Sequence, residues 1–242
     1  MAVDVLVMGA GSIGSFVGGS LAAVGVRVML VGRARVIDAI AGHGIALTDM
    51  DGHARHVPAE ALQLATEVPA DARPALALLC VKSAGTTQAA RELAAALPPE
   101  TVVLSLQNGV SNAAEAQRAA PTLRVLPGMV PFNVADLGPA AFHRGTDGGM
   151  AAEDDPVLRH WRAVFERALV PLDLHADMRP VQWGKLLLNL NNPVNALSGL
   201  PLRDELLQRD CRRCLAALID EALAAVAVAG TAPAARAPVP AP

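Results

Sequence analysis

The chain has 242 residues, of which 52% are hydrophobic, 2% aromatic and 18% charged, and its formal net charge is −3. That length accommodates one large domain or two smaller ones. A slightly acidic chain without long runs of lysine or arginine excludes the basic surface that binds nucleic acid, and it gives no reason to expect attachment to a membrane surface.

The three cysteines, Cys80, Cys211 and Cys214, are too few to build a disulfide framework. Cys211 and Cys214 have CxxC spacing, but neither a second CxxC nor a histidine pair completes a metal site, so we expect core or surface thiols and no metal. No apolar stretch reaches the ~18 residues of a membrane span. The apolar start contains Asp4 and breaks into glycines, unlike a signal peptide. We therefore expect a cytoplasmic protein.

Short apolar strands alternate with helices in the first part of the chain. We expect strands over Val3–Met8, Val26–Val31, Ala75–Val81 and Thr101–Leu106, and helices over Ser15–Val24 and Thr86–Leu97. Because buried strands that alternate with helices typically form a parallel sheet covered on both faces, this order predicts a doubly wound α/β domain of the Rossmann type.

Weaker signals fill the remaining part of this predicted domain. Ile45–Thr48 and Ala54–Val57 flank Asp51-Gly52, which predicts a hairpin or a local turn. We also expect strands over Arg124–Met129, Ala140–His143 and Leu172–His175, and a helix over Pro156–Leu169.

The strand signals stop after Met178, and two helices follow, over Pro180–Ser198 and Arg203–Ala229. Pro180 suits a first helical turn, and Gly199 suits a helix end. The last twelve residues contain four prolines and five alanines and offer little to bury. We therefore expect a Rossmann domain over residues 1–177, an all-helical domain over 178–230 and a disordered tail over 231–242.

The stretch Gly9-Ala10-Gly11-Ser12-Ile13-Gly14 has the GxGxxG spacing of a dinucleotide site. It follows a predicted strand directly and opens a helix, which is the context that this motif requires. Gly9 permits a tight turn, Gly11 lets the backbone approach a pyrophosphate, and Gly14 lets helix and strand pack closely. Free N–H groups at the helix start then bind the phosphates. The alternative is a glycine-rich turn without a ligand.

Two arginines follow the second predicted strand, which ends at Val31. Cofactors with a free ribose 2′-hydroxyl usually meet Asp or Glu at this place, whereas this chain has Arg33 and Arg35. Because a guanidinium matches a 2′-phosphate, the sequence predicts NADP(H) in preference to NAD(H). The alternative is that both arginines form the solvated start of the next helix.

Polar side chains also follow two later strands. Lys82 comes directly after Ala75–Val81, and Asn108 follows Thr101–Leu106. The carboxyl ends of the strands face the ligand crevice of an open α/β sheet. We therefore expect Lys82 to hold a carboxylate or phosphate, and Asn108 to bind the nicotinamide ribose or the substrate. A structural role in a turn is the alternative for each.

Trp183–Pro193 reads as an apolar helix that carries a lysine and three asparagines. Lys185, Asn189 and Asn192 are spaced i, i+4 and i+7, so a continuous helix would place them on one face. A cation and amides set among leucines need polar partners, and a small polar ligand is one such partner. The alternative for Lys185 is a solvated side chain that covers apolar surface with its methylenes.

Four motifs in this order resemble the ketopantoate reductase (2-dehydropantoate 2-reductase) family: VLVMGAGSIGS, LLCVKS, LSLQNGV and WGKLLLNLNNPVNALSG. The resemblance covers about residues 1 to 230. It implies a Rossmann domain followed by helices, and reduction of 2-dehydropantoate by NADPH in pantothenate synthesis. Lys185 matches the proton donor and Asn189 the first substrate-binding asparagine, while Lys82 and Asn108 match polar residues beside nicotinamide and substrate.

The resemblance departs from the family at two places. The family's second asparagine lies four residues beyond the first, whereas Asn192 lies three beyond Asn189, so Asn191 or Asn195 remains an alternative. Family members also continue with further helices, which makes the helical domain incomplete here. Glu221 matches a recurrent acidic position.

Two other functions remain open. One is a related dehydrogenase for another 2-oxo or hydroxy acid, and the other is a truncated, inactive NADP(H)-binding protein. The apolar share of the late helices leaves a homodimer or aggregation open.

Overall fold

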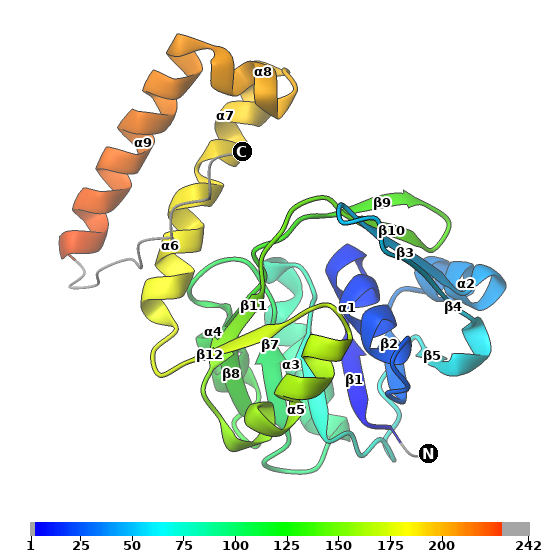
Figure 1. Cartoon of the computed structure of the whole chain (residues 1–242). Helices are drawn as coiled ribbons and strands as arrows, with labels where there is room; N and C mark the ends of the chain where they lie inside the picture. Colours follow the sequence, from blue (N-terminus) through cyan, green and yellow to red (C-terminus); the bar gives the residue numbers. More distant parts are fainter. Residues whose placement is uncertain (1–2, 229–242) are drawn as a thin grey trace. The chain divides into compact units, whose positions relative to one another are not determined.

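The computed structural model describes residues 3–228, which divide into two compact units between Met178 and Arg179 (Figure 1). The expected tail over 231–242 lies outside the described residues. The first unit is a mixed α/β structure, and the second consists of helices. The expectation of a Rossmann-type sheet followed by a helical part is confirmed.

Within the described residues, eight strands of the first unit form one sheet in the order β12-β11-β8-β7-β6-β1-β2-β5. These strands are β1 Val5–Met8, β2 Val28–Val31, β5 Leu62–Ala65, β6 Leu76–Leu79, β7 Val102–Ser105, β8 Arg124–Met129, β11 Met150–Glu153 and β12 Leu172–His175. All neighbouring pairs are parallel apart from β8 with β11. From β5 to β8 the strands follow the order of a dinucleotide-binding sheet. The order reverses between the neighbouring strands β1 and β6, which is the switch point of the sheet.

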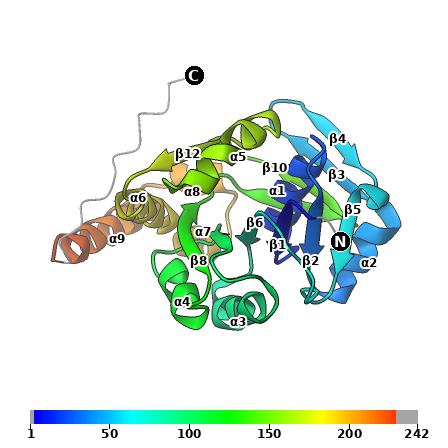
Figure 2. The same ribbon diagram turned by 90° about the horizontal axis from the view of Figure 1, so that it is seen from below.

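Helices cover both faces of this sheet (Figure 2). They are α1 Ser12–Ala22, α2 Ala34–His43, α3 Thr86–Ala96, α4 Asn112–Ala119 and α5 Pro156–Arg167, with short 3₁₀ turns at Ala59–Ala61 and Ser83–Gly85. Apolar residues of α1, α2 and α5 join one core cluster, and those of α3 and α4 join the other.

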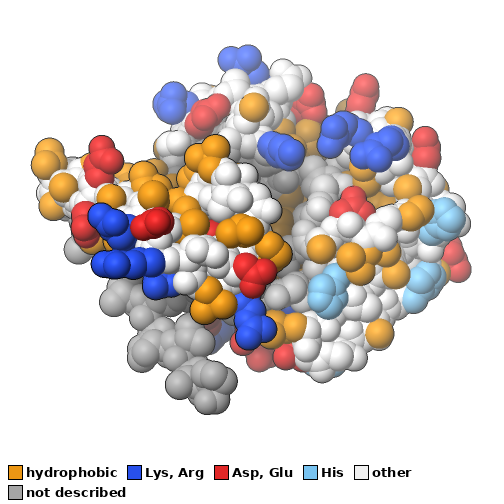
Figure 3. Space-filling model, turned by 90° about the horizontal axis from the view of Figure 1, so that it is seen from above, with side chains coloured by type: hydrophobic (Ala, Val, Ile, Leu, Met, Phe, Trp, Pro, Cys, Tyr) orange, Lys and Arg blue, Asp and Glu red, His pale blue; other side chains and the backbone are white. Residues whose placement is uncertain are grey.

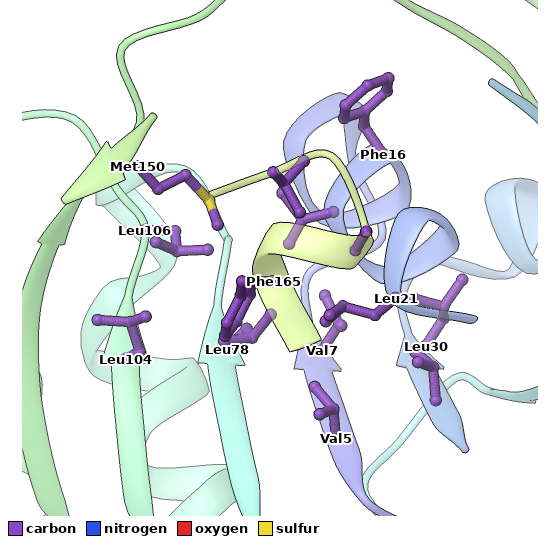
Figure 4. Packing of buried hydrophobic residues seen from close by; sticks show 14 of the residues in the cluster. Val5, Val7, Phe16, Leu21, Leu30, Leu78, Leu104, Leu106, Met150 and Phe165 are labelled. Atoms are coloured by element: carbon purple, nitrogen blue, oxygen red, sulfur yellow. The ribbon is translucent and has the colours of Figure 1, made fainter. Parts of the chain in front are cut away.

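The strands supply both clusters because successive side chains point to opposite faces. Val5 and Val7 belong to the first cluster, whereas Leu6 and Met8 belong to the second. Figure 4 shows Phe165 of α5 beside Leu78 in the first cluster. Strands buried on both faces explain the continuous apolar runs of the sequence.

A smaller sheet has the order β4-β3-β10-β9. Its strands are β3 Ile45–Asp49, β4 Ala54–Val57, β9 Val134–Gly138 and β10 Ala141–Arg144. β3 and β4 pair antiparallel around Asp51 and Gly52, so the expected hairpin is confirmed.

The second unit contains α6 Arg179–Asn189, α7 Asn191–Ser198, α8 Leu202–Leu207 and α9 Arg209–Val228. The two helices expected here are therefore wrong as continuous elements, because breaks occur at Leu190 and Gln208. Pro193 lacks an N–H group and leaves the carbonyl of Asn189 without its helical donor. The N–H of Leu190 bonds to the carbonyl of Leu187 at 3.2 Å, as in a tighter 3₁₀ turn.

Several large apolar side chains of the helical unit are exposed, among them Leu197 at 89% and Leu207 at 70%. Figure 3 shows apolar side chains lying among charged ones over these helices. Between residues 3 and 228, no helix combines the length and apolar character that crossing a bilayer requires.

Candidate functional site

A groove of about 500 Å³ opens at the carboxyl ends of β1, β2 and β6. Five predicted cofactor residues line it: Gly9, Ala10, Gly11, Arg33 and Lys82. It lies at the switch point of the sheet, where open α/β folds bind ligands. All of these residues belong to the first unit.

The backbone around the groove requires glycine at two motif positions. Gly9 has φ +111°, and a Cβ there would lie 2.7 Å from the backbone nitrogen of Val81. A Cβ on Gly14 would collide with the carbonyl oxygen of Gly9. At Gly11, by contrast, no heavy atom lies within 4 Å of the ideal Cβ position. The space in front of Gly11 is therefore open to a ligand, which fits close approach by a pyrophosphate.

The first turn of α1 supplies hydrogen-bond donors beside this space. Gly11 is the N-cap, and the N–H of Ser15 bonds to the Gly11 carbonyl at 2.8 Å. Ser12, Ile13 and Gly14 come earlier, where helical N–H groups have no acceptor within the helix. The first turn contains no acidic residue. These donors and the helix dipole fit a phosphate group. The predicted helix start at Ser15 was thus three residues late.

Arg33 is the N-cap residue of α2, and its exposed side chain lines the groove. Arg35 is exposed one residue inside α2. Within residues 3–228, neither guanidinium forms a hydrogen bond or an ion pair. Arg33 therefore suits a ribose 2′-phosphate, with which a guanidinium pairs well. It suits a free ribose 2′-hydroxyl less well, because a carboxylate usually binds that group.

The loops that carry Lys82 and Asn108 are tied together by buried Gln107. Its Nε2 donates to the carbonyl oxygen of Val81 at 2.9 Å and to Oγ1 of Thr86 at 2.8 Å. Its Oε1 accepts a hydrogen bond from Ser105 Oγ at 3.0 Å.

Asn112 completes this network from the start of α4. Its Nδ2 donates to Ser83 Oγ at 3.1 Å and to the carbonyl oxygen of Asn108 at 2.5 Å. Its Oδ1 accepts from Thr86 Oγ1 at 3.3 Å. The side chains of Lys82 and Asn108 remain exposed. Gln107 and Asn112 thus hold two loops whose outward side chains remain available to a ligand.

Sequence reasoning did not assign roles to Gln107 and Asn112. Their positions were the available signal. Gln107 follows the buried strand β7, and Asn112 is the first residue of α4. A sequence does not reveal that their side chains point inward.

Lys185 and Asn189 lie on α6, whereas Asn192 lies on α7. The expected continuous helix is therefore interrupted at Leu190, where the hydrogen bonding becomes that of a 3₁₀ turn while the backbone dihedrals stay helical. Lys185 and Asn189 are half-buried, and Asn192 is exposed. Within the described chain, neither Asn189 nor Asn192 forms a side-chain hydrogen bond, so both amides remain available.

Asn191 and Asn195 have a different environment. The Nδ2 atoms of Asn191 and Asn195 donate to Oε2 of Glu205 at 3.0 Å and 3.1 Å, respectively. Asn195 Nδ2 also donates to the carbonyl oxygen of Leu200 at 3.0 Å. The two alternatives to Asn192 are thus already engaged, while Glu221 is exposed on α9.

Cys80 is partly buried at the wall of the groove. Burial raises the pKa of its thiol to about 12. The thiol therefore stays protonated near neutral pH and is a poor nucleophile.

Among residues 3–228, Asp49, Asp51 and His53 form the one group whose spacing would suit a metal ion. Arg144 donates to Oδ2 of Asp49 at 3.3 Å and to Oδ2 of Asp51 at 3.0 Å. Because the Arg144 guanidinium already balances the negative charge of these carboxylates, we assign a structural role to the cluster.

Comparison with known proteins places these features in a family. A family model described as ketopantoate reductase PanE/ApbA matches residues 5–154. A 2-dehydropantoate 2-reductase from Halobacterium salinarum is 32% identical over 202 residues, which cover 81% of this chain. The match spans 65% of that relative, just under two thirds of its length.

Solved structures have the same fold. A PanE/ApbA family ketopantoate reductase from Ralstonia eutropha JMP134 is 28% identical with a TM-score of 0.85, covering 96% of this chain and 77% of that one. A D-mandelate dehydrogenase solved with NADH and anilino(oxo)acetate has a TM-score of 0.79, covering 95% of this chain and 75% of that one. At 17% identity it shows likeness of fold alone. Because the family model matches more than half of its residues, this chain belongs to the ketopantoate reductase PanE/ApbA family.

Proposed function

We propose that this chain reduces 2-dehydropantoate to pantoate with NADPH, with Lys185 as the proton donor. The single observation that carries the proposal is the groove at the switch point, where Gly11 leaves room for a pyrophosphate and Arg33 has no partner among residues 3–228. Family membership supports the substrate.

The residues of the first unit would bind and orient the cofactor. The N–H groups of Ser12, Ile13 and Gly14 would bind the pyrophosphate. Arg33 would pair with the 2′-phosphate, and Lys82 and Asn108 would orient the nicotinamide end and the substrate. When bound, NADPH supplies the hydride that reduces the ketone carbon.

Lys185 would supply the proton. As the ketone carbon gains the hydride, its oxygen takes a proton from the Nζ ammonium, so the C=O double bond becomes C–OH and the lysine becomes neutral. The same positive charge stabilises the developing alkoxide before transfer. Asn189 and Asn192, whose amides have no partner among residues 3–228, would hold the substrate's hydroxyl and carbonyl groups without adding charge.

A second candidate is a dehydrogenase for another 2-oxo acid. The fold likeness to D-mandelate dehydrogenase motivates it, since the same architecture serves another hydroxy acid in that protein. A third candidate is an NADP(H)-binding protein without activity, which the groove motivates because all of its lining residues belong to the first unit.

Turnover measurements separate these candidates. Purified protein is given NADPH or NADH with 2-dehydropantoate, phenylglyoxylate or pyruvate, and oxidation of the cofactor is followed by absorbance. We expect kcat/KM for 2-dehydropantoate with NADPH to exceed the other combinations by at least about 10-fold. A preference for phenylglyoxylate supports the second candidate. NADPH binding without turnover of any acid supports the third, and either result contradicts our proposal.

A further inference from the structure

Glu205 on α8 is a fully buried carboxylate with 0% exposure. Its Oε2 accepts the amide hydrogens of Asn191 and Asn195, at 3.0 Å and 3.1 Å. Carboxylates are almost never fully buried unless they are paired, and here both side-chain donors within residues 3–228 are neutral amides.

The cluster is only partly satisfied. Oε1 of Glu205 and Oδ1 of Asn191 are buried and have no hydrogen-bond partner in the described residues. A buried acceptor without a partner destabilises the folded state, because it has lost the hydrogen bonds that water gives it in the unfolded state. Apolar side chains of similar size in place of Glu205 and both amides would therefore stabilise this place at least as well. Stability alone does not account for a carboxylate here.

The two bonds fix the rotation of α7 about its axis. Asn191 and Asn195 are four residues apart and so lie on one face of the helix. Asn192 lies about 100° farther round the helix. With the first pair held inward by Glu205, Asn192 is left on the exposed side, where its amide forms no hydrogen bond with any residue that the structure describes.

The same constraint reaches the end of α6. Leu190, between the two helices, keeps helical dihedrals of φ −61° and ψ −18°. A rotation set in α7 is therefore passed to Asn189, one residue before Leu190. Glu205 thus separates the four asparagines into two pairs. Asn191 and Asn195 are held by the protein, whereas Asn189 and Asn192 are presented to a ligand.

We propose that Glu205 is a positioning residue that fixes α7 so that Asn189 and Asn192 meet the substrate together. The inference rests on the proposed reduction of a 2-oxo acid. Glu205 acts through Asn191 and Asn195 and touches no substrate itself.

The kinetic test compares Glu205→Gln with Glu205→Leu. Glutamine keeps an oxygen that can accept both amides, whereas leucine of similar size offers none. We expect Glu205→Leu to raise KM for 2-dehydropantoate by about 10- to 100-fold, as misplaced binding groups do. Glu205→Gln should stay within about threefold of the parent, and the Kd of NADPH should not change in either variant. An unchanged KM in Glu205→Leu, or equal losses in both variants, overturns the proposal.

A second variant covers the case in which Glu205→Leu fails to fold. Asn195→Leu removes one of the two donors to Glu205 and leaves the carboxylate in place. It should raise KM in the same direction by a smaller factor while the Kd of NADPH stays unchanged. An unchanged KM in Asn195→Leu overturns the proposal.

Side-chain amide NMR separates this inference from the proposed function. The NH₂ groups of Asn191 and Asn195 should exchange slowly with water in the parent and in Glu205→Gln, and quickly in Glu205→Leu, which has no oxygen to accept them. Equal exchange in all three proteins refutes the positioning role, whether or not the enzyme is active. Slow exchange in a parent that reduces no 2-oxo acid refutes the proposed function instead.

Discussion

Arg33 is the residue whose charge would decide between the two nicotinamide cofactors. It lines the groove and has no partner in the described chain, whereas Arg35 does not line the groove. Arg33→Ala should raise the Kd of NADPH by about 10- to 100-fold, equivalent to about 1.4–2.8 kcal/mol, because a charge-assisted contact with the 2′-phosphate is lost. Fluorescence titration measures the Kd.

Two controls sharpen this prediction. The Kd of NADH should be nearly unchanged in Arg33→Ala, since NADH lacks the phosphate. Arg35→Ala should weaken NADPH binding less than Arg33→Ala does. Equal weakening of both cofactors by Arg33→Ala would show that Arg33 does not recognise the phosphate.

Cys80 permits a prediction about chemical reactivity. Burial holds the pKa of this thiol at about 12, so almost none of it is thiolate at pH 8. Cys214 is exposed on α9. With iodoacetamide at pH 8, we expect Cys80 to be alkylated at least about 10-fold more slowly than Cys214, as followed by peptide mass spectrometry. Faster alkylation of Cys80 would mean that the thiol is not held in a buried site.

At the scale of elements, Gln107 joins the loops after β6 and β7. Gln107→Leu would leave the carbonyl of Val81 and Oγ1 of Thr86 without their donor. We expect a loss of about 1–3 kcal/mol in the free energy of unfolding, and weaker NADPH binding because the Lys82 loop loosens. Urea denaturation and cofactor titration measure the two effects.

Gln88→Leu is the matched control for this substitution. Gln88 is exposed on α3 and bonds only to Glu92 among the described residues, at 2.8 Å. The substitution Gln88→Leu should lower the free energy of unfolding by less than about 0.5 kcal/mol. Similar losses of unfolding free energy in Gln107→Leu and Gln88→Leu would show that the buried hydrogen bonds of Gln107 add no stability beyond that of a surface bond.

Elements with a strong apolar signal were predictable from the sequence. β1, β2, β6 and β7 are buried along their whole length, and their apolar runs identified them. β9 is largely exposed and α4 has eight residues, so neither carries a clear apolar pattern. β5 and β11 also escaped, since a four-residue strand gives little periodicity to detect.

The candidate site was predictable to a similar extent. The glycine loop, Arg33 and Lys82 share one groove because the carboxyl ends of parallel strands meet at one edge. The roles of Gln107 and Glu205 escaped because each depends on contacts with residues from other elements. The break at Leu190 escaped because the spacing of Lys185, Asn189 and Asn192 is helical, while Pro193 cannot donate the hydrogen bond that a continuous helix needs.

At the scale of the whole molecule, one ion cluster ties the small sheet to the rest of the first unit. Arg144 of β10 bonds to Asp49, to Asp51 and to the carbonyl of Leu169, which precedes β12. Burial by itself would raise the pKa of Asp49. Hydrogen bonds from His53, its charge and that of Arg144 outweigh burial and lower this pKa.

This lowered pKa makes stability depend on pH. Because the folded state holds the Asp49 proton less tightly than the unfolded state, the stabilisation is present above the unfolded pKa, about 3.9. It is lost as the pH falls through the folded pKa. Asp49→Asn should lower the free energy of unfolding by about 1–3 kcal/mol at pH 7 and flatten its fall below about pH 4. Urea titrations across pH measure both effects, and an unchanged acid slope would contradict this account.

The exposed leucines of the second unit bear on assembly. Apolar side chains such as Leu197 and Leu207 favour a homodimer as a proposal, since their burial would remove apolar surface from water. Sedimentation velocity tests it, and a monomer at every concentration would contradict it.

The central claim is that this chain reduces 2-dehydropantoate with NADPH through Lys185. The most direct measurement is steady-state turnover of Lys185→Ala together with the Kd of NADPH. We expect kcat to fall by about 10²- to 10⁴-fold, the usual contribution of a general acid, while the Kd of NADPH stays within about twofold. Turnover within about twofold of the parent protein would contradict the account.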